Sequence, residues 1–230
     1  MYIQKEPHVY VFTGHFGSGK TEVAVNFAAE LRRQKPSGKI ALIDLDIINP
    51  FFRSADAKAR LEAMNITVEV PLYANTNVDV PALTGKMGAL IEDTEYDVVL
   101  DIGGDDLGAR AVGYYSEQIK KRSHTIFFVV NAFRPFTSTL PAALKIYDEV
   151  ESATLLKIDG IINNSNLLEH TTPATVTDAL PFLQEIADAR HVPILMHTAM
   201  RELLPALKEK LPEESLLGMD VYVKLLFARE

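Results

Sequence analysis

The chain of 230 residues contains no cysteine. Disulfides, thiolate-held metal ions and cysteine-held iron–sulfur clusters are therefore excluded. Long apolar runs are also missing, because no stretch approaches the ~20 consecutive apolar residues that a membrane-spanning helix needs. The first residues, Met1–Pro7, lack the basic start and the apolar run of a secretory signal. We expect a cytoplasmic protein without stable insertion into a membrane.

Positive charge is scarce. The chain has 23 Lys and Arg against 31 Asp and Glu, a formal net charge of −8 at pH 7, and no segment gathers basic residues. This charge repels nucleic-acid phosphates at long range, so we expect no nucleic-acid partner. Hydrophobic residues make up 47% of the chain, enough for the core of a sheet covered on both sides. The length suits one domain, residues 1–230.

Short β-branched or aromatic runs alternate with segments of helical spacing. This order predicts an α/β fold with a doubly wound, mainly parallel sheet and helices on both faces. The expected strands are His8–Thr13, Lys39–Asp46, Ile66–Val70, Asp97–Ile102, Thr125–Asn131, Gly160–Asn164 and Val192–His197. The expected helices are Thr21–Gln34, Pro81–Glu92, Gly108–Lys121, Thr139–Glu151 and Pro173–Ala189. For the apolar end, Leu216–Glu230, we expect a packed helix rather than a membrane-surface helix, because its only basic residues are Lys224 and Arg229.

One glycine-rich segment fits the phosphate-binding pattern G-x-x-x-x-G-K-[ST]. Its residues are Gly14, His15, Phe16, Gly17, Ser18, Gly19, Lys20 and Thr21. The glycines let backbone N–H groups converge on phosphate oxygens, Lys20 reaches the β- and γ-phosphates, and the Thr21 hydroxyl faces Mg²⁺. The segment follows an apolar strand and precedes a helix, whose N-terminus attracts anions. We therefore expect a P-loop nucleotide-binding domain.

Carboxylates stand at the ends of two expected strands. Asp101 follows Val98–Leu100, the position at which a carboxylate holds the Mg²⁺ shell. Gly104 would then offer its N–H to the γ-phosphate, and the alternative is that Gly103 and Gly104 only form a tight turn.

Asp44 and Asp46 end an earlier strand. Their side chains point the same way, and two adjacent like charges need something positive between them. We expect Thr21, Asp44, Asp46 and Asp101 to hold Mg²⁺. The alternative is that Asp44 or Asp46 caps the turn at Asn49-Pro50.

These segments, in this order, resemble the deviant-Walker P-loop ATPases, which include MinD, the ParA partition proteins and the nitrogenase iron protein. The resemblance ends with Gly160–Asn164. It implies that ATP and Mg²⁺ are bound, that Asp46 positions the attacking water or the metal shell, and that Asp105 is a second candidate base. It also implies that Asn164 contacts the adenine.

A separate feature of the sequence, the segment at the end of the expected strand Gly160–Asn164, bears on whether adenine or guanine is bound. The segment Asn163-Asn164-Ser165-Asn166 lacks the lysine and the aspartate of the guanine-reading pattern N-K-x-D. An asparagine amide pairs with adenine through one donor and one acceptor, so we expect ATP rather than GTP. The alternative is that these asparagines only shape a turn.

His15 departs from the resembled pattern. Members of the family carry a lysine immediately after the first glycine of the loop, and it crosses a nucleotide-dependent homodimer interface to the partner's γ-phosphate. An imidazole, with an unperturbed pKa of ~6.5, supplies only a fraction of that charge. His15 is therefore either a nucleotide ligand or a solvent-facing loop residue.

The leading functional hypothesis is a slow ATPase that acts as a nucleotide switch for a partner protein. The first alternative is an ATP-dependent, carboxylate-activating synthetase of the dethiobiotin synthetase or cobyrinate amidase type. The second is a module that binds ATP without turnover. Asn49–Arg53 is the candidate contact for a partner or an acceptor, unless Phe51 and Phe52 pack under the loop.

Overall fold

The computed structural model describes residues 2–45, 54–70, 85–103 and 106–222. In these residues eight strands form one sheet with the order β3-β2-β4-β1-β5-β6-β7-β8. The strands are β1 (Val9–Thr13), β2 (Lys39–Leu45), β3 (Thr67–Glu69), β4 (Tyr96–Ile102), β5 (His124–Val130), β6 (Gly160–Asn163), β7 (Ile194–Met200) and β8 (Leu216–Met219). Each described pairing is parallel. The predicted doubly wound parallel fold is confirmed.

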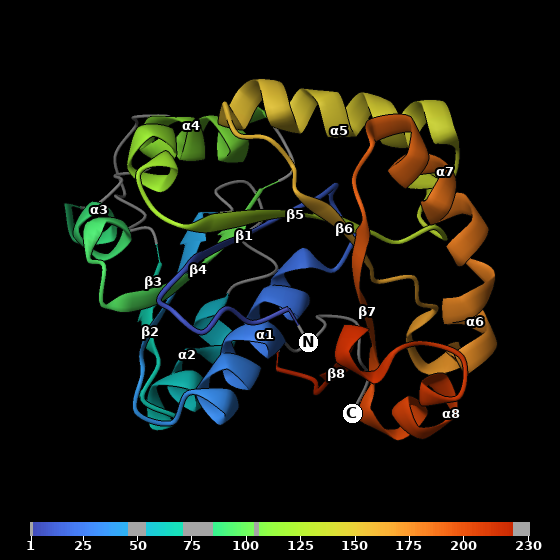
Figure 1. Cartoon of the computed structure of the whole chain (residues 1–230), viewed down its shortest axis with the longest axis horizontal. Helices are drawn as coiled ribbons and strands as arrows, with labels where there is room; N and C mark the ends of the chain where they lie inside the picture. The colour runs from blue at the N-terminus through green and yellow to red at the C-terminus, as the bar shows by residue number, and fades with distance from the viewer. Residues whose placement is uncertain (1, 46–53, 71–84, 104–105, 223–230) are drawn as a thin grey trace.

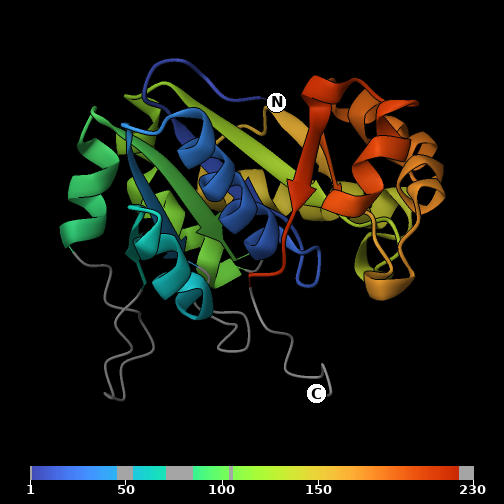
Figure 2. The ribbon, with the colours of Figure 1, turned by 90° about the horizontal axis from the view of Figure 1, so that it is seen from below.

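Helices cover both faces of this sheet. They are α1 (Lys20–Gln34), α2 (Ser54–Ala63), α3 (Gly85–Glu92), α4 (Asp106–Lys120), α5 (Leu140–Thr154), α6 (Pro173–Asp178), α7 (Leu180–Arg190) and α8 (Leu204–Lys208). Figure 1 shows α4 and α5 above the sheet and α1 and α2 below it. In the view from below, α1 lies in front of the central strands and runs in nearly the same direction (Figure 2).

Side chains of the central strands alternate between two cores. On β1, Val9 and Val11 join the core that contains residues of α4 and α5, while Tyr10 and Phe12 join the core that contains residues of α1. All four side chains are fully buried. This two-sided burial explains why the central strands read as continuous apolar runs in the sequence.

The strand order places β1 between β4 and β5. Because the strands are parallel, their carboxyl ends meet at one edge of the sheet. The loops that follow β1, β2, β4, β5 and β6 therefore open at that edge, the usual position of a ligand site in such folds.

Two expectations about helices are wrong. The predicted helix Pro173–Ala189 is two helices, α6 and α7, because Pro181 has no N–H to continue the helical hydrogen bonds. The expected terminal helix begins instead as strand β8, whose Leu217 and Met219 pack beside α1 while it pairs with β7. Residues 223–230 lie outside the described part.

Several boundaries differ from the sequence predictions. Helices α2 and α8 were not expected, and the start of the predicted helix Pro81–Glu92 lies outside the described residues. In the described part of the chain, no helix is both long enough and apolar enough to cross a membrane.

Candidate functional site

The loop between β1 and α1 forms a cradle of glycines. Gly14, Gly17 and Gly19 have φ angles of 151°, 78° and 82°, which other residues rarely adopt. A Cβ on Gly19 would lie 2.3 Å from Nδ2 of Asn164, and a Cβ on Gly14 would lie 2.4 Å from the carbonyl oxygen of Val129. Both the backbone conformation and the close neighbours therefore require glycine here.

The first turn of α1 presents its polar groups to this cradle. Lys20 and Thr21 are 6% and 5% exposed. The residue that precedes the helix, Gly19, offers no side-chain cap, and the hydroxyl of Ser18 is buried without a hydrogen-bond partner among the described residues. Phosphate oxygens are acceptors for such N–H and hydroxyl donors, so the loop fits a phosphate group.

Two carboxylates lie on the same face of the sheet as α1. Asp44 on β2 and Asp101 on β4 are register partners and are buried. Asp44 lies two residues after Leu42 and Asp101 two residues after Val99, so each carboxylate shares a face of the sheet with that apolar residue. Leu42 and Val99 pack in the core beside α1. Both carboxylates therefore point toward the face on which α1 begins with Thr21.

These oxygen donors suit a hard divalent cation. A carboxylate pair and a hydroxyl, completed by phosphate oxygens and water, is the kind of ligand set that Mg²⁺ accepts. No cluster of three or more His, Asp or Glu side chains that could hold a metal ion occurs within the described residues. Asp46, Gly104, Asp105 and Asn49–Arg53 lie outside them, so their proposed roles stay predictions.

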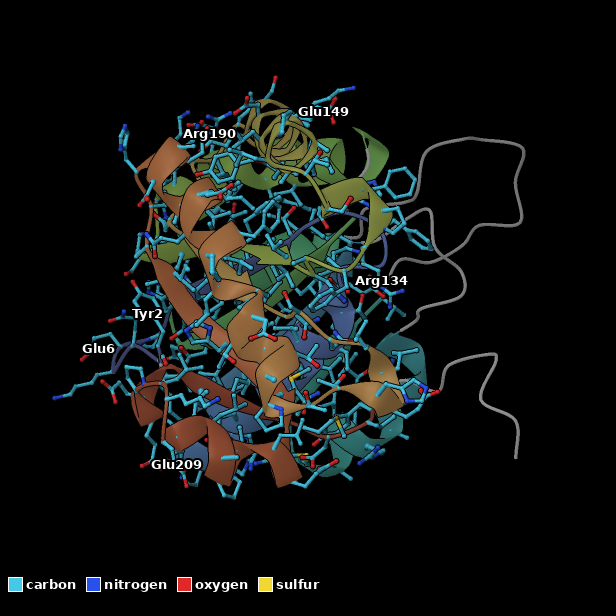
Figure 3. The ribbon with its side chains drawn as sticks, turned by 90° about the vertical axis from the view of Figure 1, so that its right-hand side faces the viewer. Tyr2, Glu6, Arg134, Glu149, Arg190 and Glu209 are labelled. Carbon is cyan, nitrogen blue, oxygen red and sulfur yellow. The ribbon has the colours of Figure 1, made fainter. Side chains whose placement is uncertain are left out.

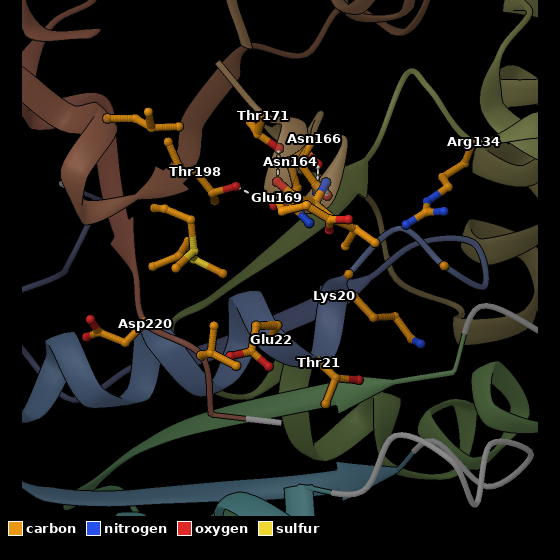
Figure 4. A pocket seen from close by; sticks show the side chains of 18 of the residues that line it. Lys20, Thr21, Glu22, Arg134, Asn164, Asn166, Glu169, Thr171, Thr198 and Asp220 are labelled. Atoms are coloured by element: carbon orange, nitrogen blue, oxygen red, sulfur yellow. Dashed lines mark hydrogen bonds between the residues drawn. The ribbon is translucent and has the colours of Figure 1, made fainter. Parts of the chain in front are cut away.

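A cavity of about 470 Å³ opens beside the phosphate loop (Figure 4). This volume lies within the range of small-molecule sites, about 300–1,000 Å³. Apolar side chains form much of its wall, namely Leu168, Ala199, Met200, Leu203, Met219 and Val221. Figure 4 shows Lys20 and Arg134 toward one end and Asp220 toward the other. The cavity thus has a cationic end beside the phosphate loop and an apolar, partly acidic end.

Asn164 ties the phosphate loop to the neighbouring strands. Its Nδ2 donates a hydrogen bond to the carbonyl oxygen of Ser18 at 2.6 Å, and its Oδ1 accepts one from Oγ1 of Thr198 at 2.5 Å. The residue lines the cavity but is only 7% exposed. Asn164 therefore holds the loop in place, while its predicted contact with adenine stays a prediction.

A segment after β8, Asp220–Tyr222, closes one side of the cavity, and we call it the C-terminal strap. The amide of Asn26 on α1 donates to the carbonyl oxygen of Asp220 at 2.9 Å and accepts from its N–H at 2.7 Å. Glu22 accepts the N–H of Tyr222 at 2.5 Å, and Arg201 forms an ion pair with Asp220 at 2.9 Å. The sequence analysis missed this wall, although a lone asparagine within the apolar run Val23–Ala29 was the available signal.

The ring of His15 packs on the turn after β5. Its ring stacks on Phe136, with the ring centroids 4.3 Å apart, and Nδ1 lies 2.9 Å from the carbonyl oxygen of Phe16. His15 is not among the residues that line the cavity. Arg134, which no sequence pattern singled out, does line it, and no signal in the sequence could have found it, because the pairing of β5 with β1 brings it there.

No protein-family model and no curated protein matches the chain. Solved structures do. FtsY from Thermotoga maritima matches at 19% identity over 96% of this chain and 68% of that chain, with a TM-score of 0.52. FlhF complexed with GTP/Mg²⁺ matches at 17% identity over 88% and 69%, with a TM-score of 0.54. The signal recognition particle receptor FtsY from Elizabethkingia anophelis in complex with GDP matches at 16% identity over 86% and 59%, with a TM-score of 0.51.

These likenesses establish the fold. Together with the glycine cradle they define a P-loop nucleoside triphosphatase fold. The chain spans only about 59% of the length of the first FtsY structure that it matches. The finer resemblance to the MinD and ParA group, the choice of base and the partner are therefore matters of proposal.

Proposed function

We propose that this chain binds ATP with Mg²⁺ in the phosphate loop and hydrolyses it slowly, as a nucleotide switch read by a partner protein. The observation that carries the proposal is the glycine cradle with Lys20 and Thr21 buried at its end. Lys20 would meet the β- and γ-phosphates, while Thr21, Asp44 and Asp101 would hold the cation. Bound Mg²⁺ would neutralise phosphate charge during hydrolysis.

The remaining site residues complete this proposal. Asp46 and Asp105 would position the attacking water or the metal shell, as the resemblance implies, and Gly104 would sense the γ-phosphate. β2 and β4 end at the same edge as the phosphate loop. The residues that follow them, 46–53 and 103–110, are therefore the segments that we propose a partner reads, in a cytoplasmic protein with one nucleotide-binding domain.

The preference for ATP rests on the missing guanine-reading residues. FlhF was solved with GTP/Mg²⁺ and one FtsY with GDP, so GTP is the competing ligand. Guanine presents N–H donors that need an acceptor, and an unpaired buried donor costs about 1–3 kcal/mol. Asn163–Asn166 offers no carboxylate, but Glu169 in the cavity wall does, and it favours the GTP alternative.

Calorimetry at matched Mg²⁺ separates the two bases. We expect ATP to bind at least tenfold more tightly than GTP, a gap of about 1.4 kcal/mol. Glu169→Gln removes this carboxylate and should leave ATP binding unchanged. Equal affinities of the wild type for both nucleotides would make the choice of adenine wrong while leaving the phosphate site standing.

Lys20→Ala tests the phosphate site itself. It removes the charge that meets the phosphates and should abolish tight ATP binding in a folded protein. Lys39→Ala is the matched control, because it removes a lysine charge from an exposed pair with Glu95, at the start of β2 and so at the opposite edge of the sheet from the phosphate loop. Affinity within threefold of the wild type for Lys20→Ala would contradict the assignment.

Steady-state turnover distinguishes the three functions. A switch hydrolyses ATP slowly without any acceptor and faster with its partner. The carboxylate-activating synthetase would hydrolyse little until a carboxylic acid acceptor is added, and a binding module would show no turnover in either case. We expect slow basal hydrolysis that carboxylic acids do not change.

A further inference from the structure

We propose that Arg134 is the second cation of the phosphate site and that it acts from within the same chain. The site then needs no charged residue from a second copy. This inference rests on the proposed nucleotide binding, and it names a residue that neither the sequence pattern nor the resemblance assigns.

Arg134 lies against the phosphate loop. Its Cδ and Nε would lie 4.0 Å from a Cβ placed on Gly17, and the residue lines the same cavity as Lys20. Figure 4 shows its side chain reaching from the loop after β5 toward the phosphate loop. The guanidinium therefore shares the cationic end of the cavity with Lys20.

Nothing in the described part of the chain pairs with this guanidinium. Its Nε is buried without a hydrogen-bond partner there. The other arginines whose side chains are described are all engaged, with carbonyl oxygens, carboxylates or a ring: Arg32, Arg33, Arg60, Arg122, Arg190 and Arg201. Figure 3 shows Arg134 well apart from Arg190, which lies near α5 in an ion pair with Asp148.

The turn that carries Arg134 is held in place by a buried asparagine. The side-chain Oδ1 of Asn131 accepts from the N–H of Phe133 at 3.0 Å, and its Nδ2 donates to the carbonyl oxygen of Asn166 at 3.2 Å. Its carbonyl oxygen accepts from Oγ1 of Thr137 at 2.7 Å and from the N–H of Arg134 at 3.2 Å. The guanidinium is thus presented by a fixed turn, which reduces the ordering cost of binding.

An unpaired, half-buried guanidinium needs an anion. The chain as a whole has a net charge of −8, yet no ion pair joins this cation to a carboxylate of the described residues, and it lies beside a loop that fits phosphate. Arginine binds phosphate oxygens through two parallel N–H groups, which makes such contacts strong and directional. The geometry points to the phosphate chain of the nucleotide as the partner of Arg134.

This assignment explains how the loop works without a lysine after Gly14. His15 occupies that position and stacks on Phe136, which belongs to the same turn as Arg134. In the resembled family the corresponding charge crosses from a second subunit. Here the turn after β5 would deliver it in cis, so turnover should not depend on dimer formation.

The test compares nucleotide affinity and oligomeric state in four full-length variants. Calorimetry with ATP and Mg²⁺ should give at least tenfold weaker binding for Arg134→Ala, an intermediate loss for Arg134→Lys, and a change below twofold for the matched control Arg33→Ala. Arg33 loses an exposed ion pair with Glu30 in the last turn of α1. Lys20→Ala should lose binding altogether.

The same samples report on the second half of the inference. We expect light scattering to find a monomer with ATP present, and turnover per chain to stay constant over a hundredfold range of protein concentration. An ATP-induced dimer whose turnover rises with concentration would overturn the action in cis.

The outcomes separate this inference from the proposed function. If Arg134→Ala binds ATP within threefold of the wild type while Lys20→Ala no longer binds it, the role of Arg134 is wrong and the phosphate site still stands. Retained binding by Lys20→Ala overturns the phosphate site. Thermal melting without nucleotide checks that each variant is folded, and Arg134→Gln replaces Arg134→Ala if the smaller side chain disturbs the turn.

Discussion

Asn164 has two possible roles, to hold the phosphate loop in place and to contact the base, and a substitution there can distinguish them. Asn164→Ala removes the bonds to Ser18 and Thr198, so the phosphate loop loses its tie to β6 and β7. Unmade buried hydrogen bonds cost about 1–3 kcal/mol. We expect calorimetry to show ATP and GTP weakened by similar factors.

Thr198→Val is the matched control, because it removes the Thr198 hydroxyl and leaves the bond to Ser18 intact. It should weaken both nucleotides less than Asn164→Ala does. A loss confined to ATP in Asn164→Ala would instead assign the amide to adenine, as the resemblance implies.

The carboxylates give a second residue-scale prediction. Asp101→Ala should weaken the Mg²⁺ dependence of ATP binding, because it removes a carboxylate that lies beside Asp44 on the face of the sheet covered by α1. Asp46→Ala should instead slow hydrolysis while ATP stays bound. Titration of Mg²⁺ at fixed ATP measures the first effect and single-turnover hydrolysis the second. Full turnover in both variants would contradict the proposed carboxylate set.

At the scale of elements, the C-terminal strap depends on α1. Asn26→Ala removes the paired bonds to the backbone of Asp220, so among the described hydrogen bonds only the one between Glu22 and Tyr222 would still tie the strap to α1. We expect about 1–3 kcal/mol lower unfolding free energy and several-fold weaker ATP binding, since Asp220 and Val221 line the cavity. Urea unfolding and calorimetry measure the two effects.

Gln34→Ala is the control for this variant. It removes an exposed hydrogen bond to Glu30 on the same helix, far from the strap. Unchanged affinity in Asn26→Ala would show that the strap forms no part of the nucleotide site.

Elements whose own residues carry a recognisable pattern could be predicted from the sequence. Elements whose structure depends on contacts with residues far away in the chain could not. Gly14–Thr21 and the run Ile126–Val130 carry their own patterns. The first was placed correctly between a strand and a helix, with Lys20 and Thr21 opening α1, and the second was placed correctly as a strand. The short run Leu216–Met219 reads equally well as helix or strand, and only its pairing with β7 decides. Arg134 comes near the phosphate loop only through the pairing of β1 with β5.

At the scale of the whole molecule, the amino edge of the sheet carries a buried histidine. Nε2 of His8 lies 2.8 Å from Oγ1 of Thr125, and Nδ1 lies 2.9 Å from Oγ of Ser123. Burial, and then the nearby His124, lower the pKa of His8 to about 4. The folded protein therefore keeps this imidazole neutral at pH values where an exposed histidine is charged.

This shift predicts a stability that falls with acid. Between pH 6.5 and 4 the unfolded chain binds a proton at His8 that the folded chain does not bind, so the free energy of unfolding decreases as the pH falls through that window. The expected loss is about 2–3 kcal/mol. Urea unfolding at pH 7 and pH 4.5 measures it, and His8→Gln, which cannot titrate, should lack this part of the loss. Identical pH dependence in both proteins would contradict the prediction.

The position of β1 has a consequence for synthesis on the ribosome. β1 emerges early, but its neighbours β4 and β5 begin at Tyr96 and His124. At roughly 5–20 residues per second, the first strand waits several seconds for either neighbour. The strap at Asp220 joins the cavity later still. A nucleotide bound in this cavity should therefore stabilise the finished fold more than it stabilises a nascent chain that still lacks the strap.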